Sequence, residues 1–215
     1  MKIIKVNLLA DNDEAIRDAV KVLKKGGTVV YPTDTVYGLG ANACDWKAAE
    51  QVFRIKQRPM EKALSIIARN MQWVKEIAFV PSKLEPILEQ LWPGAITVIL
   101  HKKPIIPSIV TAGKDTIGIR IPDFELTDKL MAKFGYPLIS TSANISGEEA
   151  EAVKSYFVIE DFKPRMWQPD LMLDAGNLPL SPPSTVIDFS GVKPKILRIG
   201  PVKPKQLETI LALKP

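Results

Sequence analysis

Residues 28–40 are TVVYPTDTVYGLG, the stretch that decides the fold class. Its first five residues are β-branched or aromatic up to a proline, which predicts a buried strand over 28–32. Apolar side chains at helical spacing precede this strand over 13–25, and Gly26 ends the predicted helix. Small polar residues and two glycines follow over 33–40. A strand that follows a helix and ends in polar residues is typical of an α/β sheet with a ligand at its edge.

The same alternation of β-branched runs and amphipathic stretches continues along the chain. Further strands are predicted over 2–8, 63–68, 95–101, 116–122, 137–141, 184–189 and 195–200, and further helices over 45–56, 70–77, 82–91, 126–135 and 204–212. This pattern predicts an α/β fold with a mixed, twisted sheet and flanking helices. The proline-rich segment 160–183 is predicted to be a long surface loop, so that residues 1–215 form one domain.

Composition excludes several classes of protein and of chemistry. With 46% hydrophobic and 25% charged residues, the chain has the profile of a soluble globular protein. It contains no apolar run of the roughly 18–20 residues that a membrane span needs, and no signal-peptide core is expected at its start. A single cysteine, Cys44, favours a reducing cytoplasm. One histidine, His101, and one cysteine cannot form a Cys/His zinc site, and His101 is predicted to lie at an exposed strand end.

The net charge of +5 comes from the C-terminal segment 193–215, which holds six basic residues and one acidic residue. Residues 1–192 hold 23 of each and balance. A solvated basic tail and a contact with the phosphates of RNA or of a nucleotide both fit this distribution.

Four segments carry polar or charged residues that packing alone does not require. They are YPTDTVYGLG (31–40), RIKQRPMEK (54–62), STSANISG (140–147) and the pair PPSTVIDF (182–189) and ILRIGP (196–201). Arginine and lysine at 56–62 suit phosphate oxygens, although a basic end also stabilises a helix dipole. Five hydrogen-bonding side chains within 140–146 are more than a turn uses for capping, which favours a binding site there.

The motifs PTDTVYGLG, KQRP, TIGIRIP, STSANISG, PSTVIDF and LRIGP occur in an order and spacing that resemble the YrdC-like family, from about residue 14 to residue 201. The resemblance implies a sandwich like that of YrdC and dihydroxybutanone-phosphate synthase, with a basic concave face. It also implies threonylcarbamoyl-AMP synthase activity, in which ATP, L-threonine and bicarbonate give threonylcarbamoyl-AMP and pyrophosphate, with Mg²⁺ as cofactor. This nucleotidyl transfer is the first step of threonylcarbamoyladenosine formation in tRNA, so tRNA or tRNA-modifying enzymes are expected partners.

The resemblance also assigns residues to roles. The family's Lys-Arg-Ser-Asn tetrad falls on Lys56, Arg58, Ser142 and Asn144, which would be catalytic. ATP contacts are implied for those four and for Lys62, Thr116 and Arg198, and threonine contacts for Thr35, Arg120, Ser140 and Ser184. No protein metal ligand is implied. A longer branch of the family carries a further C-terminal domain, so a chain of 215 residues is expected to be the short form.

Two alternatives remain at this point. A non-catalytic module that recognises structured RNA through a basic face would explain the C-terminal charge, although the four scattered tryptophans form no evident stacking platform. A carbamoyl-transfer domain like that of hydrogenase-maturation proteins is the other, but such a domain is normally one part of a much longer chain.

Overall fold

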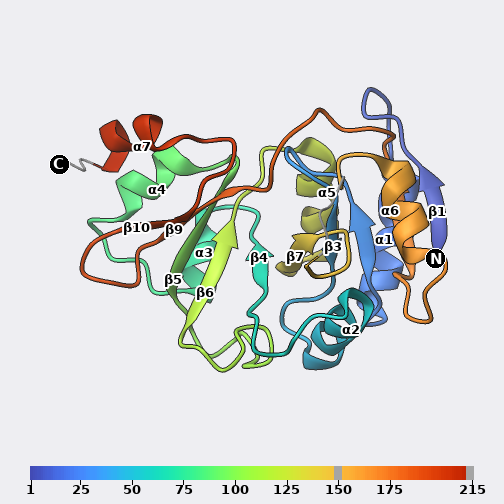
Figure 1. Ribbon diagram of the computed structural model, residues 1–215, viewed down its shortest axis with the longest axis horizontal. Helices are drawn as coiled ribbons and strands as arrows, with labels where there is room; N and C mark the ends of the chain where they lie inside the picture. The colour runs from blue at the N-terminus through green and yellow to red at the C-terminus, as the bar shows by residue number, and fades with distance from the viewer. Residues whose placement is uncertain (148–151, 212–215) are drawn as a thin grey trace.

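The computed structural model describes residues 1–147 and 152–211. Within them, ten strands form one sheet in the order β1-β8-β2-β3-β7-β4-β6-β5-β9-β10 (Figure 1). The strands are β1 (Lys2–Lys5), β2 (Val29–Tyr31), β3 (Gly38–Gly40), β4 (Ser65–Ile67), β5 (Ile96–His101), β6 (Thr116–Arg120), β7 (Leu138–Ser142), β8 (Leu171–Asp174), β9 (Thr185–Asp188) and β10 (Lys195–Arg198). The helices are α1 (Asp13–Lys24), α2 (Trp46–Lys56), α3 (Met71–Ile77), α4 (Glu85–Leu91), α5 (Glu125–Phe134), α6 (Ser155–Phe162) and α7 (Pro204–Leu211).

The sheet mixes parallel and antiparallel pairs, so the predicted mixed α/β fold is confirmed. Strand β8 runs parallel to both β1 and β2, and parallel pairs also join β4 to β6 and β5 to β9. The pairs β2–β3, β3–β7, β4–β7, β5–β6 and β9–β10 are antiparallel. Residues from nearly the whole chain therefore meet along one continuous sheet.

Helices cover the sheet through the apolar faces that the sequence predicts. The apolar stripe of α1, with Ile16, Ala19 and Leu23 buried, packs with α5 over β2 and β8. Helix α2 begins where the sequence predicts, because the Asp45 side chain accepts hydrogen bonds from two backbone amides of its first turn. Among the described helices, none has the length and the apolar character of a bilayer-spanning segment.

The prediction of a surface loop over 160–183 is wrong, because this segment contains the end of α6 and the whole of β8. Leu171, Met172 and Leu173 are buried, and β8 lies between β1 and β2. A strand that is covered on both faces shows no alternation of polar and apolar residues. The four residues of β8 therefore gave no strand pattern, and the prolines around them favoured a loop. Strand β3 was also not predicted, and the last residue of the predicted helix 204–212 lies outside the described residues.

The register of the central strands gives the sheet two chemically different faces. Ser65 of β4 is paired with Ser140 of β7 on one side and with Gly118 of β6 on the other. The intervening residues Ile66 and Ile119 are fully buried. Since strand side chains alternate between faces, one face of the central sheet is apolar core and the other presents hydroxyl groups. The second face forms the floor of a pocket.

Candidate active site

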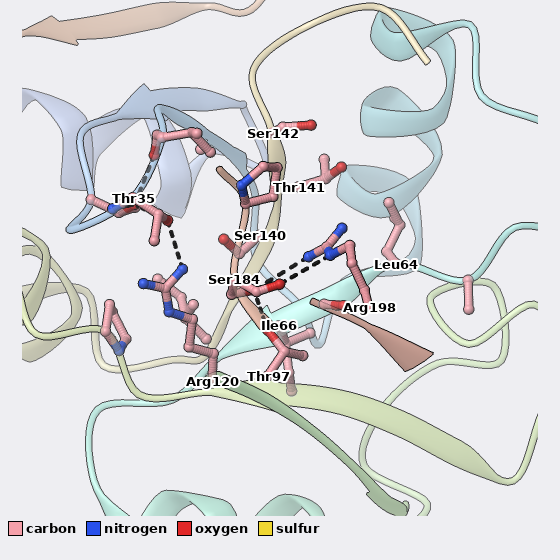
Figure 2. Close-up of a pocket in the computed structure, with 18 of the residues that line it drawn as sticks. Thr35, Leu64, Ile66, Thr97, Arg120, Ser140, Thr141, Ser142, Ser184 and Arg198 are labelled. Carbon is pink, nitrogen blue, oxygen red and sulfur yellow. Dashed lines mark hydrogen bonds between the residues drawn. The ribbon is translucent and has the colours of Figure 1, made fainter. Parts of the chain in front are cut away.

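A pocket lies on the hydroxyl face of the sheet and collects residues from all four polar sequence segments (Figure 2). Its floor comes from the central strands β7, β4, β6 and β5, and its walls come from the loops before β3, after α2 and before β9. The polar and charged lining residues are Thr33, Thr35, Arg58, Ser65, Thr97, Arg120, Ser140, Thr141, Ser142, Ser184 and Arg198. No aspartate or glutamate belongs to this described lining, so the pocket is suited to an anion.

Two arginines of the lining, Arg58 and Arg198, have no acidic partner among residues 1–147 and 152–211. The Arg58 guanidinium donates to the Lys62 carbonyl oxygen at 2.9 Å and to the Ala63 carbonyl oxygen at 2.7 Å. Arg198 donates to the carbonyl oxygen and the hydroxyl of Ser184, at 3.0 and 3.3 Å. Burial lowers the pKa of both guanidiniums, which remain charged. Both cations are thus fixed in position without being neutralised.

The third arginine, Arg120, is neutralised within the protein. It forms an ion pair with Asp34, donates to the Thr35 hydroxyl at 2.8 Å and donates to the Gly94 carbonyl oxygen at 2.9 Å. Three contacts leave two of its five N–H groups for a ligand. Arg120 therefore joins the segment 33–36 to the end of β6, and it can still bind a carboxylate on its open side.

Lys56 lies beneath the pocket and shapes the turn that follows β7. Its ammonium donates to the carbonyl oxygens of Ser142 and Asn144 at 2.5 and 2.6 Å, and it lies 3.4 Å from Asn144 Oδ1. The Ser142 hydroxyl in turn donates to Asn144 Oδ1 at 2.5 Å. Burial, with a smaller repulsion from Arg58, lowers the pKa of Lys56 to about 7, although three accepting oxygens favour its charged form. Lys56, Ser142 and Asn144 of the predicted tetrad are thus in direct contact, and Lys56 supports the turn that holds the other two.

Ser184 links the two ends of the pocket floor. Its hydroxyl lies 2.8 Å from the Thr97 hydroxyl of β5, and both its polar oxygens accept from Arg198 of β10. Figure 2 shows Arg120 and Arg198 on either side of Ser184 in this view, with Thr97 below it. As the alternation of β10 predicts, Arg198 faces the pocket while Leu197 and Ile199 are exposed.

Comparison with known proteins places the chain in a family. Residues 21–200 match the Sua5/YciO/YrdC family model, whose description is telomere recombination. The chain belongs to the Sua5/YciO/YrdC family. It is 34% identical over 197 residues to the threonylcarbamoyl-AMP synthase of Pyrococcus abyssi and 39% identical over 210 residues to a putative threonylcarbamoyl-AMP synthase of Methanocaldococcus jannaschii. These alignments cover 91% and 96% of this chain.

The backbone also matches a solved structure of the family. The crystal structure of P. abyssi Sua5 complexed with L-threonine superimposes with a TM-score of 0.92 at 32% identity, over 98% of this chain and 61% of that chain. The present chain spans 57% of the length of the P. abyssi relative and 96% of the M. jannaschii relative. The fold expected from the family resemblance is confirmed.

In this member of the Sua5/YciO/YrdC family, seven of the predicted site residues line the pocket, and four do not. Lys56 is beneath it, and Asn144 is held in the turn beside Ser142. Lys62 is exposed and contributes its carbonyl oxygen to Arg58, whereas Thr116 opens β6 at the strand end remote from Arg120. ATP contacts from Lys62 and Thr116 stay predictions.

Sequence reasoning did not single out Ser65 or Thr97 as site residues, although both line the pocket. Thr141, which belongs to the segment favoured as a binding site, lines it as well. Ser65 and Thr97 are single hydroxyls inside the apolar strands SII and ITVILH. A polar residue at an otherwise apolar strand position is a signal that could have found them. His101, by contrast, is exposed and contacts the Ser190 carbonyl oxygen, as its position in the sequence predicts.

Gly200 holds the wall of the pocket by close backbone packing. A Cβ atom at this position would lie 2.3 Å from the Pro183 carbonyl oxygen and 2.5 Å from the Thr185 nitrogen. The Gly200 amide also donates to the Thr185 hydroxyl at 2.9 Å. Any side chain here must therefore displace the backbone on both sides of Ser184.

Gly200→Ala is expected to lower both the stability of the protein and its activity, because the displaced backbone carries Ser184 and its contacts to Thr97 and Arg198. Overpacking of this kind costs about 1–3 kcal/mol. The matched control is Gly191→Ala, where the nearest atom to the new methyl group would be 3.8 Å away. Thermal unfolding and substrate turnover of both variants check this expectation. Equal melting temperatures for the two variants would contradict it.

Proposed function

We propose that the chain is a threonylcarbamoyl-AMP synthase, a nucleotidyltransferase that joins ATP, L-threonine and bicarbonate. Two similar proteins carry this name, one of them as a putative assignment, and P. abyssi Sua5 has been crystallised with L-threonine. The observation that carries the proposal is the division of the pocket into two parts. Arg58 and Arg198 lack acidic partners among the described residues, whereas Arg120 and the hydroxyls of Thr35, Ser140 and Ser184 form a second group in the pocket.

The cations Arg58 and Arg198 fit the polyphosphate of ATP. A nucleotide triphosphate brings about four negative charges, and guanidinium groups bind phosphate oxygens with paired N–H donors. Fixed cations also stabilise the charge that develops on pyrophosphate as it leaves, since they need no reorganisation during the reaction. Arg58 and Arg198 are fixed in this sense, because each is anchored by two oxygens of the protein.

The part of the pocket around Arg120 fits the amino acid. The open side of Arg120 binds the threonine carboxylate, and the hydroxyls of Thr35, Ser140 and Ser184 hold the rest of the molecule. In the reaction, the threonine nitrogen attacks the bicarbonate carbon, a C–N bond forms and water leaves, which gives a carbamate. A carbamate oxygen then forms a bond to the α-phosphorus as the bond to pyrophosphate breaks. The protein supplies no nucleophile and acts by positioning and charge.

Lys56 and the turn 142–144 orient the reacting groups in this proposal. The ammonium fixes the carbonyl oxygens of Ser142 and Asn144, so the Ser142 side chain faces the pocket from a rigid turn. A preorganised turn places donors against the α-phosphate with little loss of entropy.

The donor set of the pocket fits a Mg²⁺ ion that arrives with the nucleotide. The described lining offers hydroxyls such as Thr141 and Ser142 and no carboxylate, and residues 1–147 and 152–211 contain no group of three His, Cys, Asp or Glu residues that could hold a metal. Mg²⁺ commonly keeps several waters and binds through substrate phosphates. When bound, it would neutralise charge on the departing phosphates.

The test is a measurement of pyrophosphate release with each substrate omitted in turn. The proposal expects release that requires ATP, threonine and bicarbonate together. Release with ATP alone, or equal release without bicarbonate, would contradict it. A purely RNA-binding module would release no pyrophosphate under any of these conditions.

Arg120→Ala is expected to raise the KM for threonine at least about tenfold while changing the KM for ATP far less, because a charge-assisted hydrogen bond contributes about 1.5–3 kcal/mol. Asp34→Asn serves as the control, since it breaks the same ion pair and keeps the guanidinium. Steady-state kinetics with each substrate varied in turn gives both constants. Equal increases for the two substrates would remove Arg120 from the threonine site.

The product of this reaction is a mixed anhydride, which transfers its acyl group readily. We therefore propose that it passes to a tRNA-modifying enzyme, with the reducing cytoplasm as the compartment.

The single cysteine, Cys44, is half-buried and unpaired, and burial raises the pKa of its thiol, which suits a structural role.

A further inference from the structure

Two residues of the pocket lining, Ser65 and Thr97, lie on either side of Gly118, and their side chains differ in character. On β6, Gly118 is paired with Ser65 of β4, and β5 lies on its other side. A methyl group built on Gly118 would lie 2.8 Å from the Ser65 hydroxyl oxygen and 3.2 Å from the Thr97 methyl carbon Cγ2. Above the glycine, the floor therefore carries a hydroxyl on one side and a methyl group on the other.

The hydroxyl of Ser65 is available to a ligand. Its side chain lines the pocket, and in the described part of the chain it takes part in no hydrogen bond. Among the described residues, every buried side-chain oxygen has a hydrogen-bond partner. Because the Ser65 oxygen has no such partner, it is not buried and can be reached from the pocket. A serine hydroxyl offers one donor and two acceptor positions, and no described residue occupies those of Ser65.

The methyl group of Thr97 is fixed in its direction. Thr97 is 5% exposed, and its hydroxyl lies 2.8 Å from the hydroxyl of Ser184, the residue before β9 (Figure 2). Because a threonine has one dominant choice at χ1 once its hydroxyl is engaged, this contact turns the methyl group toward Gly118. Ser184 thus determines which surface Thr97 presents to the floor.

We propose that Ser65 and Thr97, on either side of Gly118, recognise the side chain of the amino-acid substrate. Threonine carries one hydroxyl and one methyl group on its β-carbon, and the floor presents one partner for each. The predicted threonine contacts Arg120, Ser140 and Ser184 surround this place, because Ser140 is paired with Ser65, Ser184 contacts Thr97, and Arg120 follows Gly118 by two residues on the same face. The assignment rests on the proposed function and adds the residues that select threonine from its analogues.

The expected size of the selection follows from the two contacts. Loss of one neutral hydrogen bond, worth about 1 kcal/mol, corresponds to roughly fivefold in affinity. Loss of one buried methyl contact, worth about 0.8 kcal/mol, corresponds to roughly fourfold. Serine lacks the methyl group, 2-aminobutyrate lacks the hydroxyl, and allothreonine exchanges the two. All three are expected to bind the wild-type protein more weakly than L-threonine.

The test is calorimetric binding of L-threonine, L-serine, L-2-aminobutyrate and L-allothreonine to the full chain. In Ser65→Ala, the preference for threonine over 2-aminobutyrate is expected to fall about fivefold while the preference over serine is kept. In Thr97→Ser, which retains the hydroxyl for Ser184, the preference over serine is expected to fall about fourfold while the preference over 2-aminobutyrate is kept. Ser108→Ala, at an exposed serine outside the pocket lining, is the control and keeps every ratio.

The outcomes separate this assignment from the proposed function. If the wild-type chain binds threonine and both variants keep wild-type ratios among the four amino acids, the side-chain assignment is wrong and the proposed function stands. A loss of affinity that is equal for all four ligands also overturns the assignment, since it indicates a general disturbance of the pocket. If the wild-type chain shows no threonine binding and no threonine-dependent pyrophosphate release, both the proposed function and the assignment fail.

Discussion

Arg58→Ala is expected to lower kcat/KM about ten- to a hundredfold while leaving the fold intact. The Arg58 guanidinium faces the pocket and has no acidic partner in the described part of the chain, so its removal takes a full cation from the polyphosphate site. A charge-assisted hydrogen bond is worth about 1.5–3 kcal/mol, which corresponds to this range of rates. Its protein contacts are to two carbonyl oxygens of the adjoining loop, so little packing is lost.

The matched control for Arg58→Ala is Arg54→Ala. Arg54 lies in the last turn of α2, is exposed, and pairs with Glu50 and with the Trp167 ring. We expect wild-type turnover from this variant, because surface ion pairs contribute little. Turnover and melting curves of both variants decide the matter. A folded Arg58→Ala protein with wild-type kcat/KM would show that the phosphates bind elsewhere.

Lys56→Met is expected to lower kcat/KM by at least about a hundredfold. Below about pH 7, where Lys56 is charged, its ammonium holds the carbonyl oxygens of Ser142 and Asn144, and two such charge-assisted bonds are each worth about 1.5–3 kcal/mol. Methionine fills a similar volume but donates nothing, so the turn loses its fixed geometry. Lys47→Met, at an exposed lysine of the same helix, is the control and is expected to keep wild-type turnover.

The pH dependence of stability gives an independent test of the Lys56 environment. Burial lowers the pKa of Lys56 to about 7 in the folded protein, and its ordinary value is 10.5. Between these two pH values the unfolded chain binds more protons than the folded one, so this group makes the free energy of unfolding rise with pH. Chemical denaturation of wild type and Lys56→Met from pH 6 to 10 should show this rise only in the wild type. Parallel curves would contradict the assigned environment.

The sequence predicts the polar segments of the site well, because each follows a strand or helix with a strong pattern. Arg198 illustrates this, since its place between Leu197 and Ile199 in a strand predicts that it faces away from them, and it does. The segment around Ser142 and Asn144 was likewise favoured as a binding site, because it holds more hydrogen-bonding groups than a turn uses. Local sequence patterns are sufficient to predict site residues that lie together in one contiguous motif.

The features that the sequence did not predict depend on contacts between distant segments. Strand β8 has no alternation because both its faces are covered, and the contact of the Lys56 ammonium with the turn after β7 joins residues far apart in the sequence. The ATP contact of Lys56 stays a prediction. Ser65 and Thr97 become a pair only through the register of β4, β6 and β5. Register is a property of the folded sheet, which explains why the floor of the pocket was not foreseen.

The measurement that tests the central claim most directly is the isolation of the nucleotide product from a reaction with labelled bicarbonate and labelled threonine. The proposed synthase activity predicts one AMP-containing product that carries both labels in equal amounts, formed together with pyrophosphate. It also predicts that Arg58→Ala slows the appearance of this product and that Arg54→Ala does not. An adenylate that carries threonine without the bicarbonate carbon, or the absence of any labelled nucleotide, would contradict the account.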